Sequence, residues 1–162
     1  MIRFRYIYLV IGVALTLAAC QNNKGRSSTS GGSSKEQAIV TIQSQNNFFT
    51  TTNKLQSAVA AQNLVLLKQY DIQAMMKMVG MNIGPFTTFQ LFHPRYGKPI
   101  INNDPDAFVS TPLDIAVRES NGKITVFYRK PSDVYHIFNL PSSLTSKLDN
   151  DFAKIAKAAT SK

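Results

Sequence analysis

The spacing of hydrophobic and polar positions changes several times along this chain, and each change predicts an element. β-branched residues at 38–42 predict a first strand. Apolar residues at near-helical spacing follow the threonines at 50–52, so we expect one of these threonines to be the N-cap of a helix that runs to about Gln62. Residues 65–67 predict a buried second strand that ends near Tyr70.

A second group of elements follows in the middle of the chain. Residues 72–79 predict a short helix that Gly80 stops, and the β-prone residues 86–92 predict a third strand. The short helix carries methionines at 75, 76 and 78, which we interpret as flexible fillers of irregular gaps in the core. A copper or haem site is the alternative interpretation of this cluster.

The clearest patterns lie in the C-terminal third. Two alternating runs at 113–118 and 123–128 flank Asn121-Gly122, a dipeptide that favours the tight type I′ turn of a β-hairpin. A helix is predicted to begin near Ser142 or Ser143 and to bury one apolar stripe against a sheet. This stripe consists of Leu144, Leu148, Phe152, Ile155, Ala156 and Ala159. The order of strands and helices predicts an α+β fold.

The N-terminal segment has the layout of a signal peptide. Arg3 and Arg5 precede an apolar run at 7–19, which is shorter than the roughly 20 residues that a transmembrane helix needs. Leu17-Ala18-Ala19-Cys20 resembles a lipobox, the motif that precedes the acylated cysteine of bacterial lipoproteins. We therefore predict a signal peptide over residues 1–19 and palmitate on Cys20, which anchors the protein to a membrane. An ordinary signal peptide that ends near a buried cysteine is the alternative.

The next residues predict a tether rather than a folded element. Residues 20–36 are mostly Gln, Asn, Ser, Thr, Gly and basic residues, a composition that cannot bury enough apolar surface to fold. Such a flexible chain spans roughly 20 Å. Residues 37–162 are then expected to form a single domain. Gln21, directly after Cys20, favours sorting to the outer membrane, facing the periplasm, over the inner membrane.

Charge and export together limit the partners. The formal net charge is +9, which in a cytosolic protein suggests nucleic acid, but an exported protein meets anionic lipids or cell-wall polymers instead. The lysines are scattered, so they also fit an ordinary solvated surface. We expect no nucleic-acid partner.

Catalytic chemistry has little support in the sequence. With Cys20 acylated, the groups left for acid, base or metal chemistry are His93, His136, Tyr70, Asp71, Asp114 and Asp133. The two histidines have no recognisable metal-ligand spacing, and the chain has no phosphate-binding glycine loop and no nucleophile elbow. The sequence therefore predicts no catalytic residue, no cofactor and no metal. The alternative is a hydrolase or metal-dependent enzyme that uses His93 and His136 with nearby carboxylates.

The segment 93–106 is the candidate binding site, because it is predicted to be a loop between strands and collects polar side chains. The candidate ligand-binding residues are His93, Arg95, Tyr96 and Lys98. A purely architectural role is the alternative, in which prolines fix the backbone and Arg95 and Lys98 pair with Asp104 and Asp106.

Three sequence blocks resemble the family known as domain of unknown function 302. They are residues 89–100, 111–117 and 121–123 with the strand that follows, and the resemblance extends over about 39–159. It implies a TATA-binding-protein-like fold, with a curved, largely antiparallel sheet and two main helices on one face, often paired into a homodimer. It implies no activity. We therefore expect a membrane-anchored, non-enzymatic protein that binds a small ligand or another envelope protein.

Overall fold

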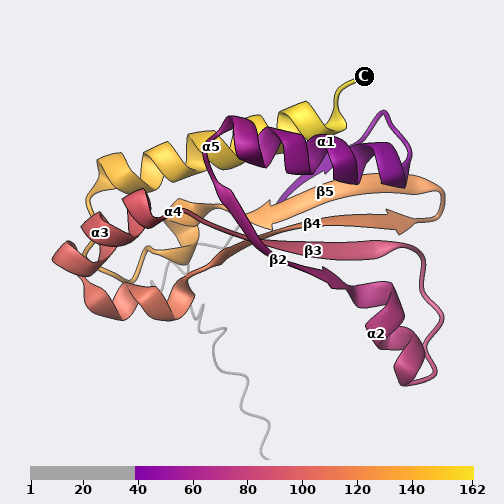
Figure 1. Cartoon of the computed structure of the whole chain (residues 1–162), viewed down its shortest axis with the longest axis horizontal. Coiled ribbons are helices and arrows are strands. Elements are labelled where there is room, and N and C mark those ends of the chain that lie inside the picture. The colour runs from indigo at the N-terminus through magenta and orange to yellow at the C-terminus, as the bar shows by residue number, and fades with distance from the viewer. Residues whose placement is uncertain (1–38) are drawn as a thin grey trace, which may run out of the picture. The chain divides into compact units, whose positions relative to one another are not determined.

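One antiparallel sheet of five strands organises the domain (Figure 1). Its spatial order is β1-β5-β4-β3-β2, and the strands span the ranges Ile39–Gln43 (β1), Val65–Asp71 (β2), Phe86–Phe92 (β3), Leu113–Ser120 (β4) and Lys123–Arg129 (β5). This computed structural model describes residues 39–162. The predicted signal peptide, Cys20 and the tether lie outside the described residues.

The hairpin between β4 and β5 is confirmed. Ser120 pairs with Lys123, so the turn consists of the two residues between them. Asn121 and Gly122 both have positive φ angles, of 51° and 71°, as a type I′ turn requires. The third strand is also confirmed over residues 86–92.

Two helices cover one face of this sheet. Helix α1 (Phe48–Ala61) and helix α5 (Ser142–Thr160) lie side by side over the strands (Figure 1). The apolar stripe predicted for α5 packs into the core, with Phe152 and Ile155 almost fully buried. Phe89 of β3 meets them from the sheet side. The predicted α+β fold, an open antiparallel sheet with a helix pair on one face, is therefore confirmed.

The N-terminus of α1 differs from the prediction. Asn47, not a threonine, is the N-cap, and its side chain accepts a hydrogen bond from the Thr50 backbone N–H at 2.8 Å. Thr51 and Thr52 lie inside the helix and are buried, and their hydroxyls donate to the carbonyls of Asn47 and Phe49. Asn is as good a cap as Thr, and it comes first here because the helix begins one turn earlier than the apolar pattern does.

The second strand is not buried as predicted. β2 is an edge strand, and its Val65 and Leu67 are 44% and 52% exposed. A register shift between Leu66 and Lys68 interrupts its pairing with β3. Irregular pairing and an exposed lysine are features that keep an edge strand from pairing with another chain.

The prediction that the methionines of the short helix fill gaps in the core is wrong. Helix α2 (Ile72–Met78) follows β2, and Gly80 ends it with a φ of 78°, as predicted. None of its residues is buried, and Met78 is 87% exposed, so the methionines do not fill the core. Periodicity indicated the helix correctly but not its neighbours, because α2 projects beyond the sheet (Figure 1).

The segment predicted as a loop is helical. Helix α3 (Pro94–Asn103) is followed by a 3-10 turn, η1 (Pro105–Ser110). Pro94 occupies the first turn, where proline is tolerated, and the burial of Tyr96 and Ile100 offsets the hydrogen bond that Pro99 cannot donate. A last short helix, α4 (Pro131–Val134), connects β5 to the segment before α5.

Candidate functional site

Within residues 39–162, neither of the two long helices covers the second face of the sheet (Figure 1). Side chains alternate along a strand, so the residues between those that face the helices on β3, β4 and β5 point to this second side. We call it the open face. In β4, for example, Leu113, Ile115 and Val117 face the helices. The open face includes Lys68, Tyr70, Phe86, Thr88, Gln90, Asp114, Ala116, Arg118, Phe127 and Arg129.

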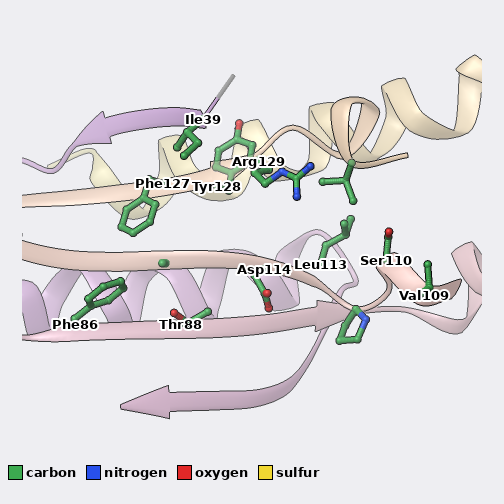
Figure 2. Close-up of a pocket in the computed structure, with 13 residues that line it drawn as sticks. Ile39, Phe86, Thr88, Val109, Ser110, Leu113, Asp114, Phe127, Tyr128 and Arg129 are labelled. Atoms are coloured by element: carbon green, nitrogen blue, oxygen red, sulfur yellow. The ribbon is translucent and has the colours of Figure 1, made fainter. Parts of the chain in front are cut away.

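A groove of about 550 Å³ lies on this face (Figure 2). Thr88 and Ala116, two small side chains on neighbouring strands, line its middle, and Phe86 and Phe127 lie at one end. Val109 lies at the other end of the open-face groove. The volume is typical of small-molecule sites, which combine apolar walls with a few polar groups.

A small polar cluster on the open face includes Asp114, which lines the groove, and two residues beside the groove, Gln90 and Tyr70. Gln90 lies opposite Asp114 in the pairing of β3 with β4, and its side-chain oxygen accepts a hydrogen bond from the Tyr70 hydroxyl at 3.2 Å. Partial burial raises the pKa of the Asp114 carboxyl above its ordinary value of 3.8, while its hydrogen bond with Gln90 opposes that shift. The carboxyl is thus partly desolvated, while the residue as a whole stays exposed. Two of the sequence-predicted acid-base candidates, Tyr70 and Asp114, thus lie on one face and share a partner.

Aromatic rings and a cation occupy the end of the groove near the hairpin. The rings of Phe86 and Phe127 lie 5.8 Å apart, and the Arg118 guanidinium lies 5.4 Å from the centre of the Phe127 ring. A second hollow of about 480 Å³ begins at Phe86 and Arg118 and extends to Asn121. Arg118 therefore lines the second hollow, and Phe86, which lines both, connects that hollow to the groove.

The candidate residues of the segment 93–106 lie elsewhere. His93 is the N-cap of α3, where its Nδ1 accepts the Arg95 backbone N–H at 3.0 Å. Lys98 is exposed on the same helix. The predicted pairing of Arg95 with Asp104 or Asp106 is not found within residues 39–162, because Arg95 turns towards Asp151 instead.

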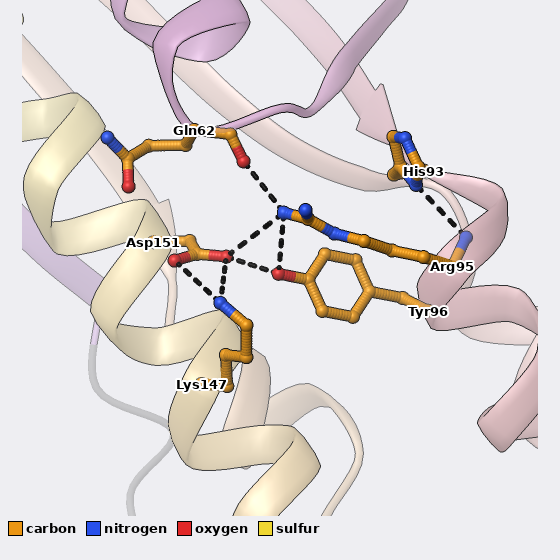
Figure 3. Close-up of polar contacts among 6 residues, drawn as sticks. All are labelled: Gln62, His93, Arg95, Tyr96, Lys147 and Asp151. Atoms are coloured by element: carbon orange, nitrogen blue, oxygen red, sulfur yellow. Dashed lines mark hydrogen bonds and ion pairs between the residues drawn. The ribbon is translucent and has the colours of Figure 1, made fainter.

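Arg95 and Tyr96 belong to a network centred on the buried carboxylate of Asp151 (Figure 3). The Tyr96 hydroxyl donates to Asp151, and Arg95 donates to the Tyr96 hydroxyl at 3.1 Å and to the Gln62 carbonyl at 2.8 Å. The guanidinium nitrogen of Arg95 lies 4.0 Å from the carboxylate, and the Lys147 ammonium lies 3.4 Å from it. The network joins α3, α5 and the end of α1.

The network changes the electrostatics of Lys147. A hydrogen bond to Tyr96, and then the charge of Asp151, raise the pKa of Lys147 above 10.5. Within residues 39–162, no buried side-chain oxygen or nitrogen lacks a hydrogen-bond partner. The network is therefore satisfied internally, and it can fix the position of α3 on the helix layer without any ligand.

The sequence itself contains a signal for this network. Lys147 and Asp151 stand four residues apart on α5, the spacing of a helical ion pair. Asp151 also lies between Leu148 and Phe152 on the buried side of that helix. A carboxylate in an apolar stripe requires buried partners, and Arg95 and Tyr96 supply them.

The histidines make separate local contacts. His136 Nδ1 lies 2.6 Å from the Asp133 carbonyl, and His93 caps α3. In the described part of the chain, no three or more His, Cys, Asp or Glu side chains form a group able to hold a metal ion. No helix over this range is long and apolar enough to cross a bilayer.

These features define a two-layer α+β domain with a helix-covered face and an open, grooved face. The chain belongs to the family described as domain of unknown function DUF302, whose model matches residues 40–161, as the sequence resemblance predicted. A crystal structure of an uncharacterised conserved DUF302 protein from Bacillus stearothermophilus is similar, with a TM-score of 0.67 at 14% identity, covering 75% of this chain and 97% of that chain. This likeness shows the fold. No curated protein matches the chain.

Proposed function

We propose that this protein is a non-enzymatic binding protein, anchored by lipid in the cell envelope, that holds a small ligand in the open-face groove. The observation that carries the proposal is the groove itself. It has a volume of about 550 Å³, apolar walls that include Phe86 and Phe127, and a partly desolvated carboxyl at Asp114. Small ligands are commonly bound in concave, mostly apolar sites with a few polar groups.

The proposed site replaces the segment 93–106 as the favoured ligand site. Arg95 and Tyr96 are engaged with Asp151, so a ligand there would have to compete with an existing network. His93, Arg95, Tyr96 and Lys98 stay sequence-based predictions of ligand contacts. A homodimer and an envelope-protein partner likewise stay predictions. So does the hydrolase or metal-dependent alternative, which needs His93 and His136 beside a carboxylate.

Filling the groove tests the proposal. Ala116, which is 5% exposed on the groove floor, is replaced by tryptophan in the mature chain with Cys20→Ser, a soluble form without lipid. Ala153→Trp, on the exposed side of α5, is the matched control. We expect the apolar fluorophore N-phenyl-1-naphthylamine to bind the parent chain and the Ala153→Trp control, but not Ala116→Trp. Equal binding by all three, with thermal unfolding showing intact folds, would contradict the proposed site.

The anchor is a separate part of the proposal and rests on the sequence. Arg3, Arg5, the apolar run at 7–19 and the lipobox-like residues before Cys20 support cleavage after residue 19 and palmitate on Cys20. Gln21 supports the outer membrane, facing the periplasm. In cells fed radiolabelled palmitate, Cys20→Ser should give an uncleaved precursor without label. Normal processing and membrane association of that variant would show that the anchor is wrong.

A further inference from the structure

We infer that the open-face groove binds a small organic anion with an apolar body, and that the Arg118 guanidinium holds its anionic group. This inference rests on the proposed function and names the class of ligand. The charge of the open face supports it. Strand alternation directs four basic residues of the described sheet to this face, namely Lys68, Arg118, Lys123 and Arg129. Asp114 is the acidic residue of the described strands that points to the same face. A face with this balance attracts anions.

Arg118 is the cation best placed to bind the anionic group. It makes no ion pair within residues 39–162, whereas Arg129 is already engaged in an interaction. The ring of Phe127, 5.4 Å away, orients the guanidinium, so little side-chain freedom is lost when an anion binds. The neighbouring acid, Glu119, also lines the second hollow, but its pairing with Ile124 directs its side chain to the opposite face of the sheet. A guanidinium fork matches a carboxylate, sulfonate or phosphate group.

The groove next to Arg118 fits the apolar body. Phe86 lines both hollows of the open face, so the apolar surface is continuous from Arg118 into the groove. Beyond the rings, the small side chain of Ala116 lines the groove floor, and the exposed Val109 lines its far end (Figure 2). Asp114 lines the groove away from Arg118, and its ionised carboxylate repels an anionic group placed beside it. The ligand is therefore oriented with its anionic group at Arg118 and its apolar body over Phe86 and Phe127.

Two fluorophores that differ by one anionic group test this inference. 1-Anilinonaphthalene-8-sulfonate has the ring system of N-phenyl-1-naphthylamine plus a sulfonate. For the mature chain with Cys20→Ser at low salt, we expect the sulfonate to bind about fivefold tighter than the neutral compound, an effect typical of an exposed ion pair. Added salt should remove the difference by screening. Arg118→Gln should also remove it, because the neutral compound has no anionic group for the guanidinium to hold.

A charge-matched control separates a local effect from net charge. Lys154→Gln removes one cation from the exposed side of α5 in the helix layer, and should keep the fivefold preference. Equal affinities in the parent chain, or a preference that survives Arg118→Gln, would overturn the anion inference. The groove proposal would still stand in either case if Ala116→Trp abolished the binding of both compounds. Loss of binding to phosphatidylglycerol vesicles in Arg118→Gln, with unchanged sulfonate binding, would also overturn the inference and assign this face to a lipid surface.

Discussion

The two faces of the sheet are made from the same strands but differ in how their polar groups are satisfied. On the helix-covered face, the carboxylate of Asp151 is 5% exposed and has Tyr96, Arg95 and Lys147 as partners. On the open face, Arg118 stacks on a phenyl ring and has no carboxylate partner within residues 39–162. A satisfied buried network stabilises one arrangement of the fold. The exposed Arg118 guanidinium is solvated by water, and under our proposal the ligand anion takes its place.

The alternation of β3 shows how one strand contributes side chains to both faces of the sheet. Phe89 is fully buried against α5 and the core, and Phe86, three residues earlier, lines the groove. Both are phenylalanines in the same strand, so their difference comes from the layer that covers them and not from their chemistry. Removing each ring therefore compares the stability provided by the two faces.

The largest expected effect is that of Phe89→Ala. Losing a fully buried phenyl group and leaving a cavity should lower the free energy of unfolding by about 3–5 kcal/mol. Phe86→Ala should lower it by only about 1 kcal/mol, because that ring is partly exposed and mainly loses its contact with Phe127. Urea unfolding of the mature chain with Cys20→Ser, followed by circular dichroism, measures both. Similar losses for the two variants would mean that the open face is covered in solution.

The buried carboxylate should give the next largest effect. Asp151→Asn keeps the shape of the side chain but removes the charge that Tyr96, Arg95 and Lys147 surround, so the free energy of unfolding should fall by about 1.5–3 kcal/mol. Asp106→Asn, an exposed carboxylate in η1, should change it by less than about 0.5 kcal/mol. The same urea experiment applies. If Asp151→Asn were as mild as the control, the network would not stabilise the helix layer.

The elements with strong local signals could be predicted from the sequence. The turn at Asn121-Gly122 requires two positive φ angles that few other dipeptides accept, and β3 is bounded by Gly84-Pro85. The apolar stripe of α5 was long enough to identify both the helix and its buried side. In each case the physical cause lies within a few neighbouring residues.

What the sequence did not reveal depends on contacts between distant elements. Pro94, Gly97 and Pro99 suggested a loop, but packing of Tyr96 against Asp151, 55 residues later, stabilises a helix there. The exposure of Met78 could not be predicted either, because amphipathic spacing does not show whether another element covers a helix.

The open-face groove could be predicted from the sequence only in part. The alternation of Leu113, Ile115 and Val117 already places Asp114 and Arg118 together on the other side of β4. That neither long helix of the described residues 39–162 covers this side follows only from the packing of both on the other face. The sequence therefore contained the residues of the proposed site but not the packing that leaves them on one open face.

The smallest expected effect tests how far the open face is withdrawn from water. Because burial raises the pKa of Asp114 in the folded protein above 3.8, the folded state holds this proton more tightly than the unfolded state does. The stability from this group is fully present below about pH 3.8 and is lost as the pH rises through the folded-state pKa. Asp114→Asn has no ionisation, so its free energy of unfolding should rise relative to that of the parent chain across this window.

The rise should be modest, because Asp114 stays partly accessible and Gln90 stabilises its charged form. Urea unfolding at a series of pH values from below 3.8 to 7 measures it, with Asp106→Asn as a variant that has the same change in charge. A difference that grows with pH for Asp114→Asn and stays flat for the control means that the groove desolvates its carboxyl before any ligand binds. Parallel curves would mean that water reaches Asp114 freely, and the groove would then differ from the helix-covered face only in shape.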